Sequence, residues 1–163
     1  MKDITNKDTT NYDHVVDCIY QKFGAEIKVA PCSERHHLNI RGGLSLHLQN
    51  VKDIAQRFFP KDKRLAFLAA IHDIGKSQVY DIDKEGYISY REPQVDHIIH
   101  TVSMLAELGI ILNPEELNAL QFHHGGWSSF KGEHSELAIK LHFCDMMATA
   151  NENKEAQKTE LLR

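Results

Sequence analysis

The sequence of 163 residues predicts an all-α fold, a helical bundle that carries one small β-hairpin. Apolar residues recur at helical spacing in most segments between Tyr12 and Ala150. Glycine, proline or a capping residue stands at most of the breaks between these segments. Only residues 79–90 have the composition of two short strands around a turn. The length fits one domain with a core of its own.

The first half of the chain predicts three helices. We expect the first over residues 12–23, because Gly24 is a natural stop, and irregular chain over residues 25–41. The second helix, 44–59, has its apolar residues on one stripe and ends at Pro60. The third begins with Asp62 as its cap, reaches residue 74 and stops at Gly75. It is apolar on every side, so we expect it to be central.

The second half begins with the hairpin, whose turn is DKEG at residues 83–86. A helix is expected over residues 93–108. The next runs to residue 124, with Asn113 as N-cap, Pro114 in the first turn and Glu116 three residues after the cap. The last helix is expected over residues 135–150. Residues 1–10 are interpreted as a flexible arm, 11–150 as the domain, and 151–163 as a polar tail that either frays or extends the last helix.

Composition restricts the classes of function. The net charge is −4 without a run of basic residues, which disfavours tight, sequence-independent binding to duplex nucleic acid. Cys18, Cys32 and Cys144 form no CxxC pair, as expected of reduced thiols. The N-terminus lacks the apolar region of a secretory signal, and no apolar run approaches the ~20 residues of a membrane span. We therefore expect a cytoplasmic protein with no membrane partner.

Histidine is unusually frequent, with 11 residues, and several histidines and aspartates fall on apolar helical surfaces. Asp145 shares a face with Leu141 and Ala148, and a buried carboxylate needs a cation, either a basic side chain or a metal. His47 lies on the apolar stripe of its helix, where a satisfied core histidine is the alternative. The pair His72-Asp73 ends the central helix, where His72 would also complement the helix dipole.

Taken together, these four residues would make a costly core without a divalent ion and an ordinary ligand set with one. Further candidates for a second ion are His97 or His100, one turn apart on a helix that could also be a surface helix, and the pair His123-His124 before two glycines. Two ions bridged by a carboxylate suit phosphoester hydrolysis, because they activate water and neutralise phosphoryl charge. Lys76 either contacts a phosphate oxygen or is an ordinary exposed lysine.

The ordered motifs resemble the HD superfamily of metal-dependent phosphohydrolases: His47 in GGLSLHLQNV, His72-Asp73 in AAIHDIGK, and Asp145 in LHFCDMMAT. Within it, the sequence is most similar to the HD domain of bacterial 3′-to-5′ exoribonucleases. That likeness adds APCSERHHLNIRGG around His37, the helix that begins at His97, and FHHGG at residues 122–126. Thr101 stands where these relatives usually have glycine.

The resemblance implies a first metal on His47, His72, Asp73 and Asp145. It implies that Asp73 bridges to a second metal on His97 and His123, with His124 a further ligand or a phosphate contact. Asp73 and Lys76 are the expected catalytic residues. His37, His100 and Trp127 are the expected substrate contacts, with Trp127 and Phe130 either stacking on a base or covering the core.

The favoured function is hydrolysis of a phosphoester in a nucleotide, a cyclic nucleotide or a short single-stranded oligonucleotide by a metal-bound hydroxide. The expected cofactor is one or two divalent ions, Mn²⁺, Fe²⁺, Ni²⁺, Co²⁺ or Mg²⁺. Two alternatives use the same ligands. One is a di-iron oxygenase on the same scaffold, and the other is a catalytically silent module that binds a nucleotide.

Overall fold

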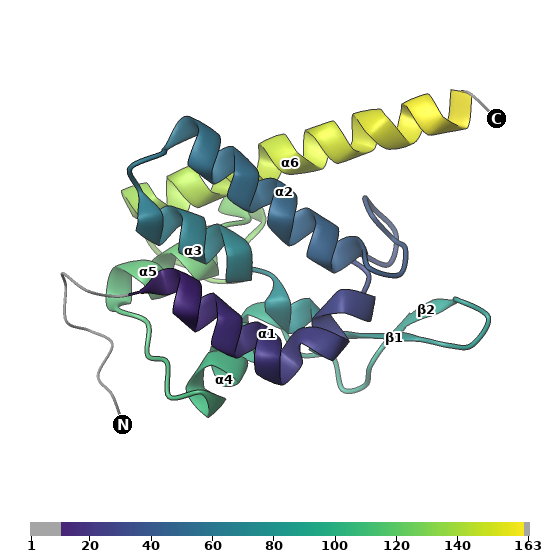
Figure 1. The fold of residues 1–163 in the computed structure, drawn as a ribbon, viewed down its shortest axis with the longest axis horizontal. Coiled ribbons are helices and arrows are strands. Elements are labelled where there is room, and N and C mark those ends of the chain that lie inside the picture. The colour runs from purple at the N-terminus through teal and green to yellow at the C-terminus, as the bar shows by residue number, and fades with distance from the viewer. Residues whose placement is uncertain (1–10, 162–163) are drawn as a thin grey trace.

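The computed structural model describes residues 11–161, so the expected N-terminal arm, residues 1–10, lies outside the described residues. The described part contains six α-helices and one two-stranded antiparallel hairpin, which confirms the all-α fold class (Figure 1). The order is α1 (Tyr12–Val29), α2 (Gly43–Phe58), α3 (Lys63–Ile71), β1 (Tyr80–Ile82), β2 (Ile88–Tyr90), α4 (His97–Glu107), α5 (Pro114–Phe122) and α6 (Glu136–Leu161). Short 3₁₀ turns follow α3 and α5.

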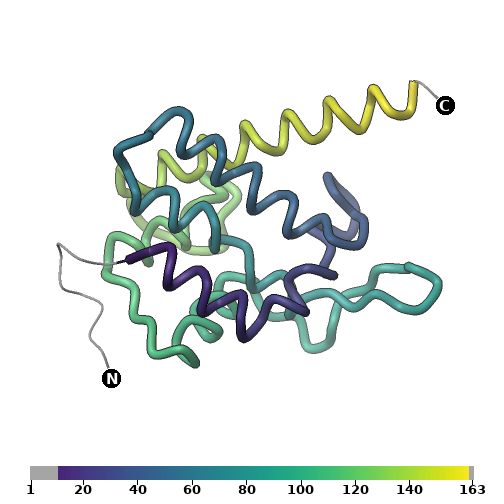
Figure 2. The backbone as a smooth tube through the Cα atoms, in the orientation of Figure 1, coloured from purple at the N-terminus to yellow at the C-terminus, as the bar shows by residue number. Residues whose placement is uncertain are grey.

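The helices pack around α3, as its apolar character predicts. Helix α2 packs against α3 and α6, α5 packs against α6, and α1 covers α2 and α3. Helix α4 packs on the 3₁₀ turn that follows α3. Both the hairpin and the C-terminal end of α6 extend away from the helical body (Figure 2). Within residues 11–161, no helix combines the length and the apolar character needed to cross a membrane.

Several local predictions are confirmed at the level of single hydrogen bonds. The side chain of Asp62 accepts a hydrogen bond from the Leu65 amide at 2.9 Å and caps α3. Asn113 and Glu116 form the expected capping box at the start of α5. The hairpin pairs Tyr80 with Tyr90, around the expected turn.

Helix α1 is longer than expected, and Gly24 does not end it. Phe23 and Ile27 are both buried and continue the apolar face of the helix past the glycine. A glycine inside a helix costs about 1 kcal/mol relative to alanine, and the burial of Ile27 is worth more than that. The irregular segment therefore begins at Ala30 instead of at residue 25.

Helices α3, α4 and α6 also differ from the expected ranges. Helix α3 ends at Ile71, so His72 and Asp73 lie in the turn that follows it. Helix α4 begins at His97 instead of residue 93, because the Asp96 carboxylate accepts a hydrogen bond from the Ile98 amide at 2.8 Å. Helix α6 continues to Leu161, so the chain after residue 150 extends the helix.

Gly75 allows the 3₁₀ turn after α3 to touch the backbone of α4. A Cβ atom at Gly75 would overlap the His97 carbonyl oxygen and crowd the Thr101 amide. The Gly75 amide donates a hydrogen bond to the Thr101 hydroxyl at 3.0 Å, and Thr101 is fully buried. This hydrogen bond of Thr101 holds α4 against the segment that carries His72 and Asp73.

We expect Gly75→Ala to lower the free energy of unfolding by about 3 kcal/mol, because the new methyl group meets backbone atoms that cannot move away alone. Urea unfolding followed by circular dichroism measures this. Gly126→Ala is the matched control, since a Cβ atom there meets nothing within 4 Å. Equal stability of the two variants would contradict the packing described for Gly75.

Candidate metal centre

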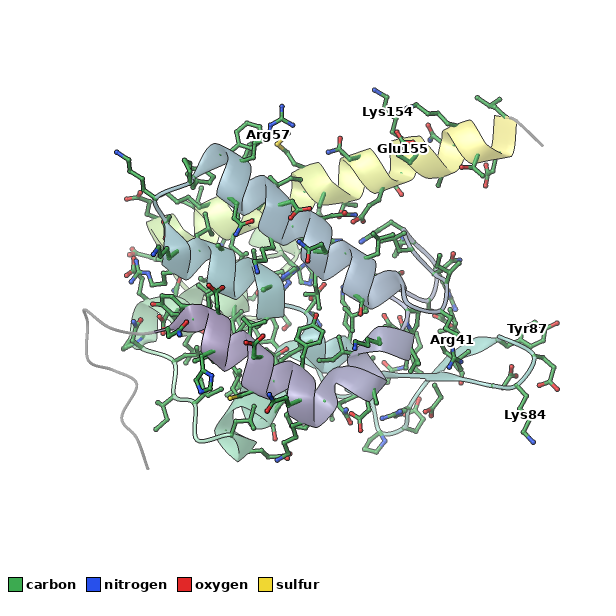
Figure 3. All side chains as sticks on the ribbon, in the orientation of Figure 1. Arg41, Arg57, Lys84, Tyr87, Lys154 and Glu155 are labelled. Atoms are coloured by element: carbon green, nitrogen blue, oxygen red, sulfur yellow. The ribbon has the colours of Figure 1, made fainter. Side chains whose placement is uncertain are left out.

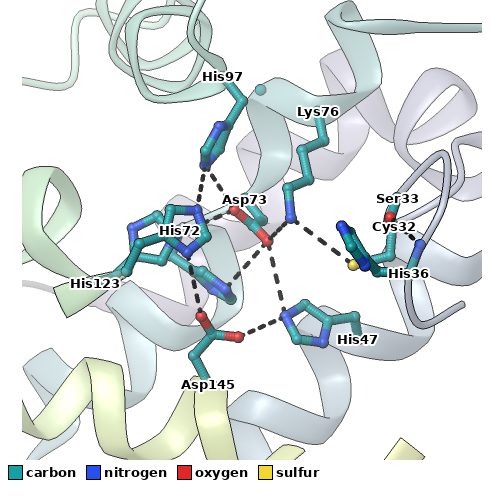
Figure 4. A network of polar contacts seen from close by, with 12 residues as sticks. Cys32, Ser33, His36, His47, His72, Asp73, Lys76, His97, His123 and Asp145 are labelled. Carbon is teal, nitrogen blue, oxygen red and sulfur yellow. Dashed lines mark hydrogen bonds and ion pairs between the residues drawn. The ribbon is translucent and has the colours of Figure 1, made fainter. Parts of the chain in front are cut away.

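Five segments of the chain bring polar side chains to one buried point. His47 comes from α2, His72 and Asp73 from the turn after α3, and Asp145 from α6. Two further segments contribute the histidines at positions 97, 123 and 124, from the start of α4 and the end of α5. Figure 4 shows His47, His72, His97 and His123 around the Asp73 carboxylate, which is fully buried, with Asp145 beside His47. We call the set the Asp73 cluster: His47, His72, Asp73, His97, His123, His124 and Asp145.

One oxygen of Asp73 faces the histidines of α4 and α5. Asp73 Oδ1 lies 3.0 Å from His97 Nε2 and 3.3 Å from His123 Nε2. His124 Nε2 lies 3.3 Å from His97 Nε2. Two ring nitrogens this close, each able to offer a lone pair, suit a shared cation between them.

The other oxygen of Asp73 faces a lysine and the histidines of α2 and α3. Asp73 Oδ2 accepts a hydrogen bond from Lys76 Nζ at 2.6 Å and lies 3.5 Å from His72 Nε2 and 3.7 Å from His47 Nε2. His47 Nε2 is also 3.0 Å from Asp145 Oδ1. The two faces of the Asp73 carboxylate therefore look toward two separate groups of donors.

Three histidines of the cluster bind an acceptor outside it through Nδ1. Each ring is thereby held in one orientation with Nε2 directed inward, the arrangement typical of metal-ligating histidines. An Nδ1–H that donates outward leaves the lone pair on Nε2. The contacts are His47 Nδ1 to both carboxylate oxygens of Glu152 at 3.1 Å, His72 Nδ1 to the Ala69 carbonyl at 2.9 Å, and His123 Nδ1 to the Leu120 carbonyl at 2.7 Å.

Four buried atoms of the cluster have no hydrogen-bond partner among residues 11–161. They are Nε2 of His47, His72 and His123, and Oδ1 of Asp73. A buried polar atom without a partner costs about 1–3 kcal/mol, so four in one place need a common partner. Imidazole nitrogens and a carboxylate oxygen are ordinary ligands of a divalent ion. The donor set therefore fits a metal.

The distances divide the donors into overlapping groups, in each of which one ligand atom per residue lies within 4.8 Å of the others. Asp73 is shared by two of them, in keeping with a carboxylate between two ions. The groups are Asp73 with His97, His123 and His124; His47 with His72 and Asp73; His72 with His123 and Asp145; and Cys32 with His37 and His47.

Electrostatics holds several ligands in the forms that bind metal, with His47 as the exception. Burial would raise the pKa of Asp73, but the charge of Lys76 together with the neighbouring histidines holds that pKa well below its usual range. Burial would lower the pKa of Lys76, whereas the Asp73 carboxylate raises it. Burial lowers the pKa of His72 to about 4 and that of His124 to about 2. At neutral pH both histidines are neutral and Asp73 is ionised.

His47 differs from these ligands. Burial would lower the pKa of His47, but the carboxylates of Asp145 and Glu152 raise it to about 9, so a metal ion must displace a proton from this ring.

Lys76 is not the ordinary exposed lysine of the alternative interpretation. Its side chain is 12% exposed and its ammonium group is bound to Asp73. His37 borders the cluster, 3.4 Å from Cys32 Sγ and 3.6 Å from Glu152 Oε2. His100 belongs to none of the donor groups formed by residues 11–161.

The two aromatic residues after His124 differ. Trp127 is 77% exposed, so the interpretation that it covers the core is wrong. Phe130 is partly buried against the core, as that interpretation predicts.

Glu152 is the residue of the site that the sequence did not identify. The sequence predicts a polar tail over residues 151–163, yet Glu152 is buried and accepts hydrogen bonds from His47 Nδ1 and from Asn50 Nδ2, the latter at 2.8 Å. A signal was present in the spacing. Asp145, Ala148 and Glu152 are separated by three and four residues, which continues the buried face of α6.

We expect Glu152→Ala to weaken Mn²⁺ binding by ~10–100-fold, because His47 loses the acceptor that fixes its tautomer and ring orientation. Calorimetric titration with Mn²⁺ measures the affinity. Glu155→Ala is the matched control, since Glu155 lies on the exposed part of the same helix and pairs with Lys158 (Figure 3). Unchanged Mn²⁺ affinity in Glu152→Ala would refute the positioning role of Glu152.

Comparison with known proteins gives a family for this fold and this cluster. Neither a curated protein nor a solved structure matches the chain. The family model of the HD domain matches residues 44–161, which contain every residue of the Asp73 cluster as well as Glu152. Since the match covers well over half of the sequence, the chain belongs to the HD domain family, whose members are generally metal-dependent phosphohydrolases.

Proposed function

We propose that the protein hydrolyses a phosphoester of a nucleotide, a cyclic nucleotide or a short single-stranded oligonucleotide with the help of one or two divalent ions held by the Asp73 cluster. The observation that carries this proposal is the group of four buried ligand atoms on His47, His72, Asp73 and His123 that have no hydrogen-bond partner within residues 11–161. Such atoms, turned toward one point from several helices, have a metal ion as their natural partner.

The first ion would bind to His47, His72, Asp73 and Asp145. The second would bind to Asp73, His97, His123 and His124, a division that the separate surroundings of the two Asp73 oxygens support. Divalent ions in such a site supply a nucleophilic water at neutral pH and neutralise charge on the phosphoryl group.

Asp73, Lys76 and Glu152 each have a separate role in the proposed reaction. Asp73 is ionised and lies between both groups of donors, so it sets the distance between them. Lys76 orients Asp73 through the 2.6 Å hydrogen bond and brings a permanent positive charge next to the reacting centre. Such a charge stabilises the oxygens of a phosphoryl group as negative charge develops on them. Glu152 accepts a hydrogen bond from His47 Nδ1, so the proton that a metal ion displaces from this ring would come from Nε2.

The substrate class rests on the likeness of the motifs around His37, His97 and His123 to the HD domains of 3′-to-5′ exoribonucleases. A nucleotide phosphoester is the shared chemistry of that group. The net charge of −4 favours a small or single-stranded substrate over duplex.

The test is hydrolysis with Mn²⁺ against nucleoside monophosphates, triphosphates, cyclic nucleotides and short single-stranded RNA and DNA. We expect release of phosphate or of nucleotides that is lost with a chelator and in Asp73→Asn, because this variant removes the charge shared by both donor groups. Asp53→Asn, an exposed change on α2, is the control and should keep the full rate. Silence across the panel in protein shown to hold metal would refute the proposal, as would full activity in Asp73→Asn.

His97 and His100 provide a second test on one helix. His97 lies 3.0 Å from Asp73, whereas His100 is absent from the donor groups of the described chain. We therefore expect His97→Ala to lower the rate at saturating Mn²⁺ by ~100-fold, with His100→Ala close to the wild-type rate. Equal losses, or a larger loss in His100→Ala, would show that the second group of donors is wrongly assigned.

A further inference from the structure

A groove of about 400 Å³ lies beside the Asp73 cluster, between the hairpin and the start of α4. Its size is within the range of small-molecule sites, toward the lower end, and suits a single nucleoside better than a longer chain. Two residues of the cluster region, Lys76 and His97, line it. Both also contact Asp73, at 2.6 and 3.0 Å, so these two side chains connect the groove to the Asp73 cluster.

The hairpin gives this groove an aromatic wall. Tyr80 and Tyr90 are paired across the two strands, with ring centroids 5.1 Å apart. Both line the groove, and Tyr90 is 39% exposed, so its ring is available to a ligand. Val79 and Val95 add apolar surface. A half-exposed aromatic ring beside apolar side chains is a typical surface for stacking a planar base.

The carboxylate among the residues that line the groove is that of Asp96, and other groups of the protein already donate hydrogen bonds to it. Asp96 accepts hydrogen bonds from the Ile98 amide at 2.8 Å and from the Ser129 hydroxyl at 2.7 Å. It also stands at the N-terminus of α4, where a negative charge is stabilised by the helix dipole. Its charge is therefore compensated locally and does not prevent an anionic ligand from approaching Lys76.

Trp127, for which the sequence predicts a contact with substrate, does not line this groove. It lies after α5, with its nearest aromatic neighbour, His142, at 6.3 Å between ring centroids. Tyr87 belongs to the hairpin as well but sits at its tip, away from the helical body (Figure 3). It is 75% exposed and outside the groove.

We propose that the groove binds the base and sugar of a nucleotide whose phosphate lies at the Asp73 cluster, and that Tyr90 stacks on the base. This assignment rests on the proposed hydrolase function and specifies its substrate as a nucleotide bound through one nucleoside unit. Tyr90 is thus a specificity-determining residue, whereas Lys76 and His97 contact the phosphate end.

The experiment compares the binding of AMP and of ribose 5-phosphate, which lacks the base, in the presence of Mn²⁺ by calorimetry. We expect Tyr90→Ala to weaken AMP binding by roughly 5- to 150-fold, the usual loss when an aromatic side chain under a base is removed. Binding of ribose 5-phosphate should not change. Tyr90→Phe keeps the ring and should retain AMP affinity, and Tyr87→Ala is the control on the same hairpin.

Three outcomes would overturn the assignment: equal AMP affinity in the wild type and Tyr90→Ala, no preference for AMP over ribose 5-phosphate, or a selective loss in Trp127→Ala. Hydrolysis separates this failure from that of the proposed function. If the wild type hydrolyses phosphoesters and Asp73→Asn does not, while Tyr90→Ala leaves AMP binding unchanged, the hydrolase stands and the groove assignment fails.

Discussion

The arrangement of this protein depends on a fully buried carboxylate, Asp73, whose charge must be compensated inside the helical bundle. Isolated burial of such a charge would cost more than a domain of this size can offset. Lys76 compensates it at one oxygen, whereas the other oxygen faces His97 and His123 and needs a cation as its partner. Because His97 lies at the start of α4 and His123 at the end of α5, this carboxylate brings both segments to the turn after α3.

Helix α6 contributes two carboxylates to the centre. Asp145 faces His47 directly, and Glu152, two turns further along, binds the opposite nitrogen of the same ring. Asn50 from α2 holds Glu152 in turn. Helix α6 thus contacts both ring nitrogens of His47. Glu152 and His47 are more than a hundred residues apart in the sequence.

Much of the fold could be predicted from the sequence, because periodicity and caps are local signals. The apolar stripe of α2, the cap at Asp62 and the capping box at Asn113 all appear as expected. The predicted end of α1 at residue 23 was wrong, because the burial of Ile27 outweighs the local effect of Gly24.

His47, His72, Asp73 and Asp145 are predicted from polar side chains on buried helical surfaces, whereas the choice of His97 over His100 rests on the family resemblance. The burial of Glu152 has a signal in its spacing from Asp145 and Ala148, but its contact with His47 on α2 appears only in the packed structure. The groove is shared by the hairpin and α4, so it too forms only on packing.

The central claim is that the Asp73 cluster is a metal centre that links α2, the turn after α3, α4, the end of α5 and α6. Thermal unfolding of chelator-treated protein, with and without Mn²⁺, tests it most directly. An ion that binds only the folded state stabilises it by about 2.7 kcal/mol at a hundred times its Kd, which corresponds to a rise in Tm of roughly 5–10 °C for a chain of this length. The account predicts such a rise. An unchanged Tm, in folded protein that retains no metal by elemental analysis, would contradict it.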